Sequence, residues 1–440
     1  MIRSFSLSNY RSIKNRASLS LLPSKSSKEL PENVFSIADK FNVLGSAVIY
    51  GANASGKSNF LKGLVDFVEF ILKSNSNQLN DTIQIYDPYL LDKTSENQSS
   101  NFEIDFILNH TRYIYTVSCM PTEITYESLS YYPKGQKVLV YERDKGNPIK
   151  FGTVLKGEKR SIEARLLPNQ LFLSKSANEN LDFIAQIYLY FSDYEFNFAQ
   201  LGSHFEMLPT GKLIGSMLMK KSQDFIKRYK QIISSLDVGI VGLEIKETND
   251  SHFFSGIIPT EGLNLINPEL LNALPKFNYE VVTLHQVYDD QLQTFKQREF
   301  SVEKESSGTK NLLMLTFNLL ETFEKGTVII IDEFEKSLHP QIAKILIQLF
   351  HDEDVNVNNA QLIFTTHDVS LLNSALFRRD QIWFTDKDEF GKTELYSLSQ
   401  IDGIRKDVPY DKWYMSGRFG ATPVVNELVI QYENAVQKRD

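Results

Sequence analysis

The feature that most constrains this chain is a glycine-rich loop between a short apolar run and a helical pattern. The loop, Gly51-Ala-Asn-Ala-Ser-Gly-Lys-Ser58, follows the run Ala47-Val-Ile-Tyr50 and fits the phosphate-loop pattern G-x-x-x-x-G-K-[ST]. This pattern requires a buried strand before the loop and a helix after it, and both are expected here. We therefore predict a strand–loop–helix unit that binds the phosphates of a nucleoside triphosphate. A glycine-rich turn without a ligand is the alternative.

The residue types of the loop suit phosphate binding. Two glycines let the backbone curl, so that successive N–H groups converge on anionic oxygens. Lys57 supplies a positive charge for the β- and γ-phosphates, and the hydroxyl of Ser58 can ligate Mg²⁺. The helix that starts near Lys57 directs its positive dipole end toward the same phosphates. The residues expected to bind the nucleotide are Gly51, Ala52, Asn53, Ala54, Ser55, Gly56, Lys57, Ser58 and Asn59.

Composition restricts the class of protein and its surroundings. A chain of 440 residues with 42% hydrophobic and 23% charged residues is typical of a soluble globular protein with several cores or one large composite domain. The formal net charge of -8 argues against bulk attraction to nucleic acid, while a local basic face stays open. Cys119 is the only cysteine, which favours a reducing cytoplasm over an internal disulfide framework. We expect no signal peptide and no membrane domain.

The first two thirds of the chain alternate between β-rich and helical patterns. The first ten residues alternate as a strand does, and residues 101–154 form several alternating segments separated by turns, which predicts an antiparallel meander. Helical periodicity extends from Ser174 to about Ser235. In the β-rich stretch that follows, strands are expected at Val241–Ile245, Phe253–Ile258 and Tyr279–Gln286.

The last third alternates regularly between helix and strand. The expected elements are helix Lys310–Phe323, strand Val328–Ile331, helix Pro340–Phe350, strand Gln361–Thr365 and strand Gln381–Thr385. This alternation is typical of a parallel sheet with helices on its faces, so the predicted fold class is α/β. We expect one composite domain in three segments: 1–173 with the phosphate loop and the meander, 174–300 with a helical insertion and a β-rich connector, and 301–440 with the remaining motifs.

Two acidic residues end one of these strands. Val328-Ile-Ile-Ile331 reads as a buried parallel strand, and Asp332-Glu333 follows at its carboxyl end, where ligand sites of α/β proteins lie. Asp332 is expected to hold Mg²⁺, and Glu333 to orient or deprotonate the attacking water. A solvated turn after a strand is the alternative for two adjacent acids.

A histidine ends the next strand. His367 follows Gln361-Leu-Ile-Phe-Thr-Thr366, which is expected to be parallel to the acidic strand. A lone histidine is more often structural, but at this place it could sense the γ-phosphate or stabilise charge that develops during hydrolysis. The predicted catalytic residues are therefore Lys57, Glu333 and His367.

A turn of small residues lies upstream of both strands. Ser306, Ser307 and Gly308 open the helix that follows, and hydroxyls, free N–H groups and a glycine together can form a second anion site. Taken alone, Ser-Ser-Gly is an ordinary helix start. The neighbouring motifs favour nucleotide binding by Ser306, Ser307 and Gly308.

Together these motifs resemble the ATP-binding-cassette (ABC) ATPases, in the branch with the SMC, RecF and OLD-type proteins. Ser306–Lys310 resembles their signature motif, Asp332-Glu333 their Walker B pair, His367 their switch histidine and Glu335–Pro340 their D-loop. The resemblance covers about Asn9 to His367 apart from the helical insertion. It implies an ABC-type P-loop NTPase head with an antiparallel β subdomain and a helical insertion, and ATP with Mg²⁺ as cofactors.

Three segments are similar to prokaryotic abortive-infection ATPases of the AbiL and PARIS types: Tyr50–Asn59, Glu305–Thr309 and Tyr414–Pro423. This resemblance implies a head-to-head homodimer in which ATP lies between Lys57 of one subunit and Ser307 and Gly308 of the other. It also implies a separate effector protein, often a Toprim-like nuclease, released or held upon phage infection. A higher oligomer, a phage trigger protein and a DNA contact stay open.

The sequence departs from the ABC pattern in places. The signature begins Glu-Ser-Ser-Gly rather than Leu-Ser-Gly-Gly, which argues against a transporter subunit. Gln170 is our candidate for the glutamine that bridges Mg²⁺ to the moving lobe, with Gln84 and Gln98 as alternatives, although such glutamines are mostly surface residues. Arg11 resembles a basic residue that SMC-like heads place near the nucleotide; a solvated arginine is the alternative.

The helical insertion is too short and too aperiodic for a long SMC coiled coil, and without cysteine pairs it has no zinc hook. Its Lys220-Lys221 and Lys227–Lys230 could form a face that contacts phosphates. An exposed amphipathic helix is the alternative.

We therefore expect a cytoplasmic, dimeric ATPase that acts as a sensor or switch in antiphage defence. Three alternatives remain. A RecF-like DNA-repair ATPase would be stimulated by duplex DNA, and a nucleotide-gated scaffold would function without hydrolysis. A transporter subunit would need a membrane partner, and both the signature and the meander disfavour it.

Overall fold

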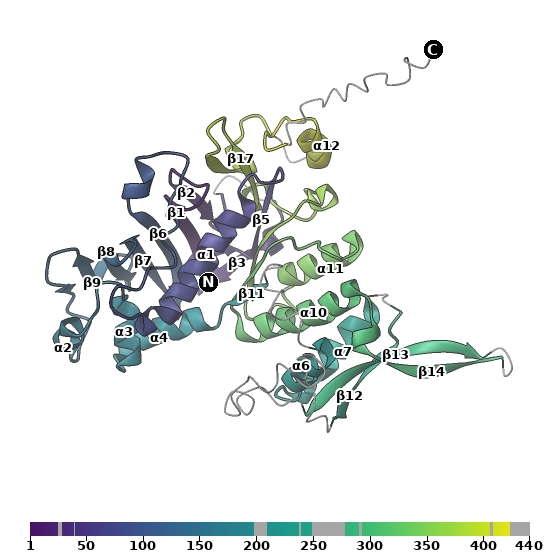
Figure 1. Cartoon of the computed structure of the whole chain (residues 1–440). Coiled ribbons are helices and arrows are strands. Elements are labelled where there is room, and N and C mark those ends of the chain that lie inside the picture. Colours follow the sequence, from purple (N-terminus) through teal and green to yellow (C-terminus); the bar gives the residue numbers. More distant parts are fainter. Residues whose placement is uncertain are drawn as a thin grey trace, which may run out of the picture.

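A computed structural model describes residues 1–24, 29–38, 40–197, 209–236, 239–248, 278–289, 293–404 and 408–422 of the chain. Two large β-sheets and the helices around them form the body, and a small third sheet extends from it (Figure 1). The chain starts inside the body and crosses between the two large sheets more than once. This crossing brings motifs that are far apart in the sequence to one place.

The first large sheet is antiparallel. Within the described residues its seven strands follow the order β10-β9-β8-β7-β6-β1-β2, and all neighbours pair antiparallel. The predicted first strand and the predicted meander are thus confirmed. The strands are β1 Ile2–Ser8, β2 Ala17–Ser20, β6 Ser100–Leu108, β7 Thr111–Met120, β8 Glu123–Tyr132, β9 Val138–Asp144 and β10 Lys150–Phe151.

The second large sheet carries the phosphate loop. Its six described strands follow the order β11-β15-β16-β5-β17-β18, parallel except for the edge strand β18. β5, β15 and β16 are buried along their whole length, as expected of central parallel strands. The strands are β5 Ser46–Gly51, β11 Glu195–Asn197, β15 Val328–Ile331, β16 Gln361–Thr365, β17 Ile382–Lys387 and β18 Thr393–Ser397.

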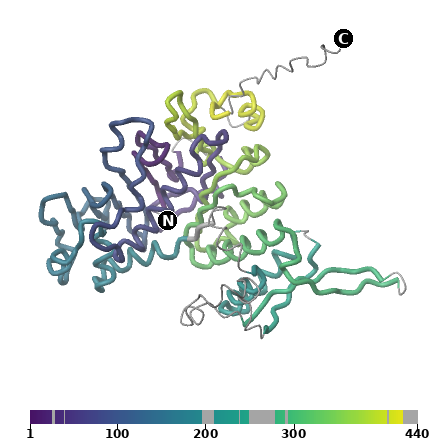
Figure 2. The backbone as a smooth tube through the Cα atoms, in the orientation of Figure 1, coloured from purple at the N-terminus to yellow at the C-terminus, as the bar shows by residue number. Residues whose placement is uncertain are grey.

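Strand β5 is an early strand inserted among late ones. It pairs with β16 on one side and with β17 on the other, so the first and last thirds of the sequence share one sheet. Figure 2 shows the purple N-terminal backbone beside the green and yellow C-terminal backbone. The loop after β5 therefore meets the ends of strands that lie more than 270 residues later in the sequence.

The helices divide between two hydrophobic cores. α1 Lys57–Lys73, α3 Phe172–Asn178 and α4 Asp182–Ser192 pack in the core of the antiparallel sheet. The other core contains α6 Thr210–Leu218, α7 Gln223–Ser235, α10 Ser307–Lys325 and α11 Pro340–His351. The predicted insertion thus contributes to both cores. Two further helices are short: α2 Lys159–Ala164 and α12 Tyr410–Met415.

One strand lies where only helices were predicted. β11, Glu195–Asn197, falls inside the helical stretch and pairs in parallel with β15 at the edge of the central sheet. Its three residues are too few to interrupt a helical pattern of apolar residues, which is why the periodicity missed it. β11 links the insertion directly to the strand that carries the acidic pair.

The third sheet is small, and part of it leaves the body. It consists of β12 Gly242–Glu247, β13 Tyr279–Asp289 and β14 Thr294–Ser301, with a long β13–β14 hairpin that projects outward (Figure 1). β14 was not predicted, because its exposed sequence lacks an apolar face. The predicted strand Phe253–Ile258 lies outside the described residues. A two-stranded ribbon, β3 Val34–Ile37 with β4 Phe41–Leu44, completes the sheets of the described residues.

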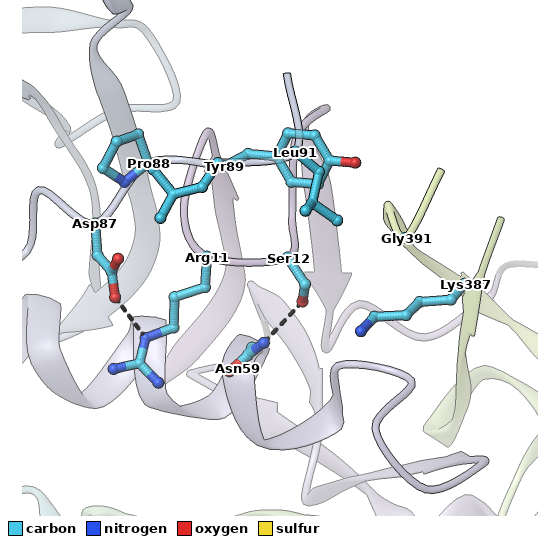
Figure 3. Close-up of a pocket in the computed structure, with 10 residues that line it drawn as sticks. Arg11, Ser12, Asn59, Asp87, Pro88, Tyr89, Leu91, Lys387 and Gly391 are labelled. Atoms are coloured by element: carbon cyan, nitrogen blue, oxygen red, sulfur yellow. Dashed lines mark hydrogen bonds and ion pairs between the residues drawn. The ribbon is translucent and has the colours of Figure 1, made fainter. Parts of the chain in front are cut away.

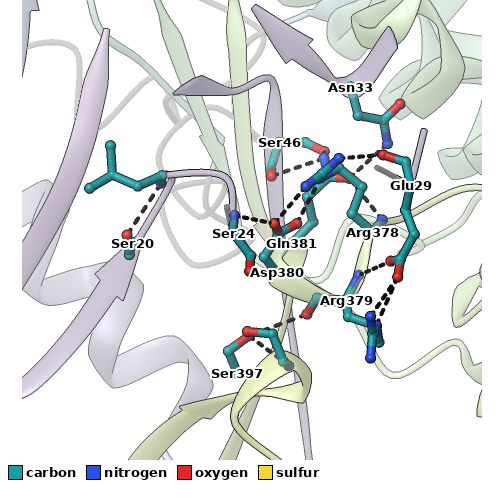
Figure 4. Close-up of polar contacts among 12 residues, drawn as sticks. Ser20, Ser24, Glu29, Asn33, Ser46, Arg378, Arg379, Asp380, Gln381 and Ser397 are labelled. Carbon is teal, nitrogen blue, oxygen red and sulfur yellow. Dashed lines mark hydrogen bonds and ion pairs between the residues drawn. The ribbon is translucent and has the colours of Figure 1, made fainter. Parts of the chain in front are cut away.

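A buried polar cluster joins the two ends of the sequence at the edge of the central sheet away from the phosphate loop (Figure 4). Arg378, only 2% exposed, forms two 2.8 Å hydrogen bonds with the carboxylate of Asp380 and also donates to the carbonyl of Glu29. Gln381 accepts from Asn33 at 2.7 Å and donates to the hydroxyl of Ser46 at 2.8 Å. The cluster fixes the start of β5 against the start of β17.

None of the helices in the described ranges combines the length and the hydrophobicity that crossing a lipid bilayer requires.

Candidate nucleotide-binding and hydrolysis site

The predicted site residues follow the carboxyl ends of neighbouring parallel strands. β15 leads to Asp332, β16 to His367 and β5 to the phosphate loop, and these strands are adjacent in the central sheet. Ligand sites of parallel α/β sheets lie at this edge. The structure thus brings Lys57, Ser58, Asp332, Glu333 and His367 together.

The phosphate loop is held by the last two strands of the sheet. Ser55 Oγ lies 2.6 Å from Thr385 Oγ1 of β17, and Thr393 Oγ1 of β18 donates to the Ser55 carbonyl at 2.8 Å. Gly56 has a φ of 111°, and a Cβ atom at this position would lie 2.2 Å from Thr393 Oγ1. Only glycine meets both the backbone conformation and the close contact.

Lys57 is folded over its own loop. Its Nζ donates to the carbonyls of Gly51 at 2.9 Å and Ala52 at 3.0 Å, and the residue is 5% exposed. Burial lowers the pKa of Lys57 to about 8, although the carboxylates of Asp332, Glu335 and Glu333 oppose this shift. The ammonium group is therefore held where phosphate oxygens can replace the two carbonyls.

Ser58 and Asp332 have the geometry of a magnesium site. Ser58 Oγ donates to Asp332 Oδ1 at 3.1 Å, and Thr365 Oγ1 of β16 donates to the same oxygen at 2.6 Å. A hydroxyl and a carboxylate are hard oxygen ligands, which Mg²⁺ prefers in combination with phosphate oxygens and water. No group of three or more His, Cys, Asp or Glu residues in the described chain could hold a metal ion by itself. The donor set thus fits a metal that arrives with a nucleotide.

Glu333 stands on a strained turn. Its φ is 55°, which non-glycine residues rarely adopt, and its backbone N–H donates to Thr365 Oγ1 at 2.8 Å. Phe334 N donates to the Thr365 carbonyl at 3.0 Å. Strain of this kind persists where the surroundings fix the backbone, often at functional sites. Thr365 therefore positions both acids of the pair, a role that the sequence did not reveal.

His367 is exposed at the same edge, and its backbone N–H donates to Glu335 Oε1 at 2.6 Å. Partial burial, and to a smaller extent the charge of Lys57, lower the pKa of His367, while Glu335, Glu333 and Asp332 raise it. A histidine with a lowered pKa is mainly neutral at neutral pH. Its ring can then donate one hydrogen bond to a phosphate oxygen without adding a charge.

The structure does not place Gln170 at this edge, which corrects the prediction of a metal ligand. Gln170 Nε2 donates to the carbonyls of Asn75 and Asn77, both at 3.0 Å, just beyond the carboxyl end of α1. The phosphate loop lies at the amino end of this 17-residue helix, a separation of about 25 Å. The alternatives Gln84 and Gln98 are exposed loop residues.

The segment that reaches the acidic pair from the insertion is β11. The register pairs Asn197 with Ile331, the residue before Asp332. Gln170 was the candidate because it lies where the meander passes into the helices. From there the chain forms α3 and α4, and it reaches the central sheet only at β11.

Arg11 lines a cavity beside the phosphate loop. The cavity, about 340 Å³, is formed by the turn after β1, the start of α1, residues 87–91 and the β17–β18 turn (Figure 3). Arg11 forms a 3.0 Å ion pair with Asp87, and Asn59 Nδ2 donates to Ser12 Oγ at 2.8 Å. Lys387 also lines the cavity. Neither Ser12 nor Lys387 belongs to a sequence motif, so the sequence analysis did not identify them. The volume and the position suit the nucleoside part of a nucleotide.

The signature turn lies apart from the phosphate loop of its own chain. Ser306 caps α10 by accepting from Thr309 N at 3.1 Å, and both Ser306 and Ser307 are exposed. A Cβ at Gly308 would lie 2.7 Å from the carbonyl of Ser337 in the D-loop. Among the hydrogen bonds and ion pairs of the described residues, none joins this turn to the phosphate loop. The turn therefore packs on the D-loop and faces outward.

Comparison with known proteins identifies the family. The chain matches the family model "AAA domain, putative AbiEii toxin, Type IV TA system" over residues 46–373, which is more than half of its length. The chain therefore belongs to this family and contains a P-loop ATPase domain. The predicted ABC-type head, with its antiparallel subdomain and insertion, is confirmed at the level of the fold.

Among solved structures, the chain is similar to the Smc head domain of Pyrococcus furiosus, with an extended coiled coil and bound to the C-terminal domain of ScpA. The identity is 14%, the similarity covers 90% of this chain and 96% of that chain, and the TM-score is 0.38. No curated protein matches the chain.

Thr365 gives a direct test of the acidic pair. Replacing it with valine removes the hydroxyl that holds Asp332 and Glu333, so we expect ATP hydrolysis to fall about 10- to 100-fold. We also expect the Mg²⁺ concentration for half-maximal activity to rise. Thr365→Ser keeps the hydroxyl and should retain most activity. Equal hydrolysis rates and Mg²⁺ dependence in Thr365→Val and wild type would contradict this role.

The pKa of Lys57 predicts how nucleotide affinity depends on pH. Phosphate binding needs the charged ammonium, which is mostly present at pH 7 and is lost as the pH rises through the free-state pKa of about 8. We expect the affinity for a fluorescent ATP analogue to fall about tenfold per pH unit above that value. In Lys57→Arg, whatever its affinity, this decline should be absent because arginine stays charged. A wild-type affinity that is constant up to about pH 9.5 would contradict the pKa assignment.

Proposed function

We propose that this chain is a cytoplasmic ATPase whose nucleotide site is completed by a second copy, and that the resulting dimer is a switch in antiphage defence. ATP binding closes the dimer and hydrolysis reopens it, so the nucleotide shifts an equilibrium between two states. The observation that carries the proposal is the outward-facing signature turn, which is separate from the phosphate loop of its own chain.

The chain supplies one half of the site from its sheet edge. Lys57 and the loop N–H groups bind the β- and γ-phosphates, while Ser58 and Asp332 hold Mg²⁺, which would neutralise phosphate charge. Glu333 orients the attacking water and accepts its proton, and His367 donates a hydrogen bond to the γ-phosphate. The cavity beside Arg11 receives the nucleoside.

The second copy supplies the other half. Ser306, Ser307 and Gly308 of that copy present hydroxyls and N–H groups at the start of α10, which suits an anionic γ-phosphate. In each chain the D-loop packs against the start of α10: a Cβ at Gly308 would lie 2.7 Å from the Ser337 carbonyl, and Asn311 Nδ2 donates to the Lys336 carbonyl at 2.9 Å. A rotation of one copy against the other would therefore move signature and D-loop together.

Two points support the proposed role in defence against phage. The sequence resembles abortive-infection ATPases, and the family description itself names a putative AbiEii toxin of a Type IV toxin–antitoxin system. In this proposal, the ATP-bound dimer controls a separate effector, a Toprim-like nuclease, and hydrolysis through Glu333 sets how long it is held. Replacing Glu333 with glutamine should then alter protection from phage, whereas a scaffold independent of hydrolysis would keep it.

A DNA-repair role is less favoured by the structure. The basic residues of the insertion are partly neutralised within the chain: Lys221 pairs with Glu321 at 3.0 Å and with Glu324 at 3.3 Å. Arg228 pairs with Asp224 at 2.8 Å. Ion pairs of this kind reduce the charge that is free to contact phosphates.

Mixing two inactive variants tests whether the site is shared. Lys57→Ala removes the phosphate-loop cation, and Ser307→Arg blocks the exposed signature without touching the loop. Each variant alone should lack ATPase activity. In a mixture, up to about a quarter of the wild-type rate should return, because half the dimers are mixed and each mixed dimer has one intact site.

The control is a mixture of Lys57→Ala with Glu333→Gln, two changes on the same half of the site. In a mixed dimer of this kind each site still carries one of the two changes, so no activity should return. Equal activity in both mixtures, or none in either mixture, would contradict a site shared between two copies.

A further inference from the structure

The β13–β14 hairpin presents an exposed aromatic surface. We call the residues 279–289 and 293–301 the hairpin arm. Tyr288 and Phe295 face each other across the strands with ring centroids 5.3 Å apart, and they are 50% and 66% exposed. Within the described residues β14 is an edge strand, and six of its eight residues are exposed. Exposed aromatic residues on an edge strand are a liability unless another surface covers them.

The hairpin arm is attached to the signature turn. Glu305, the residue before Ser306, accepts from Thr283 Oγ1 at 2.5 Å and lies 2.8 Å from His285 Nε2. Both partners belong to β13, and Thr283 is fully buried. The root of the arm is thereby fixed beside the start of α10.

A second exposed surface lies at the C-terminal end of the described chain. We call residues 410–421 the C-terminal platform. Met415 is 69% exposed, and the guanidinium of Arg418 lies over the ring of Trp413 at 4.6 Å. Phe419 is buried beneath them against Phe384 of β17. Methionine, tryptophan and arginine are the residue types enriched in protein interfaces.

The C-terminal platform is attached to the phosphate-loop side of the sheet. Ala421 N donates to Asp386 Oδ2 at 3.1 Å, and Tyr396 Oη donates to the Phe419 carbonyl at 2.7 Å. Asp386 follows Thr385, the residue that holds the phosphate loop through Ser55. The ring of Tyr414 packs 6.0 Å from that of Tyr50, at the end of β5.

The two surfaces lie at opposite ends of the same edge of the molecule. Along the central sheet the order is β15, β16, β5 and β17. α10, with the signature turn and the hairpin arm, contacts β15, whereas the C-terminal platform contacts β17 and β18. Figure 1 shows α12 and the arm at the two ends of one side of the molecule.

From this order we infer that the hairpin arm of one copy docks on the C-terminal platform of the other. The inference rests on the proposed head-to-head dimer, in which each phosphate loop faces the signature turn of the second copy. A two-fold rotation reverses the order of elements along the edge, so the surface beyond the phosphate loop meets the surface beyond the signature. Each of the two arms then contacts the second copy at one end of the ATP-bound dimer, and the exposed aromatic rings pack against Met415 and Arg418.

This contact gives the arm a role in the nucleotide switch. Because Glu305 joins the arm to the signature turn, docking of the arm and closure of the composite site occur together. The extra contact slows dissociation of the ATP-bound dimer, since interface contacts act mainly on the dissociation rate.

Cysteine cross-linking tests the contact in the full-length chain. The native Cys119 is fully buried, so introduced cysteines on the surface react alone. In a Glu333→Gln background, the variant with both Phe295→Cys and Met415→Cys should form a covalent dimer with a flexible bismaleimide when ATP is present, and much less without ATP. Either cysteine alone should give none.

A matched control uses Leu189, a residue of similar exposure on α4 (60%), away from both surfaces. The pair Phe295→Cys and Leu189→Cys should not cross-link, and Leu189→Ser should leave the dimerisation constant unchanged. Phe295→Ser should weaken ATP-dependent dimerisation about tenfold.

The outcomes separate the inference from the proposed function. An ATP-dependent dimer that forms without the Phe295–Met415 cross-link overturns the docking of the arm and leaves the shared site intact. Absence of both dimer and cross-link overturns both. Cross-linking that is as strong with Leu189→Cys, or as strong without ATP, shows random collision and also overturns the docking.

Discussion

The catalytic edge depends on a short chain of hydrogen bonds through one carboxylate. Ser58 from the phosphate loop and Thr365 from β16 both donate to Asp332 Oδ1 at the end of β15. Three adjacent strand ends, distant in sequence, thereby fix one another. The arrangement exists because β5 is inserted between β16 and β17, which places the loop beside the acidic pair rather than at an edge of the sheet. The strained turn at Glu333 is held by the same threonine.

The site at this edge of the sheet contains charged side chains that are partly shielded from water, and this favours binding of a charged ligand. Lys57 is nearly buried among Asp332, Glu333 and Glu335, so its charge is balanced by carboxylates rather than by water. A triphosphate with Mg²⁺ brings both anionic oxygens for the lysine and a cation for the acids. In a low-dielectric site these contacts, between lysine and phosphate and between Mg²⁺ and carboxylates, are electrostatically stronger than they are in water. The arrangement of these side chains is therefore organised for the ligand.

The sequence predicted those parts of the site that are contiguous motifs. It did not predict the parts that depend on contacts between distant segments. The phosphate loop and the acidic pair were predictable because each is a contiguous pattern at the end of an apolar strand. The prediction that Gln170 is a metal ligand was wrong, because its place beyond the carboxyl end of α1 follows from tertiary packing and not from a local pattern. Thr365 looked like an ordinary strand residue, and its two hydrogen bonds appear only when β15 and β16 lie side by side. The β14 strand was not predicted because it has no buried face.

In the proposed dimer, one chain holds only half of the nucleotide site. The most direct measurement is the mass of Glu333→Gln in solution by light scattering, with and without ATP and Mg²⁺. This variant keeps the binding residues and lacks the carboxylate that we propose activates water, so the proposed closed state should accumulate. We expect the 50.5 kDa mass of one chain without nucleotide and twice that mass with it. A variant that binds ATP with Mg²⁺ at saturation and still has the mass of one chain would contradict a site shared between two copies.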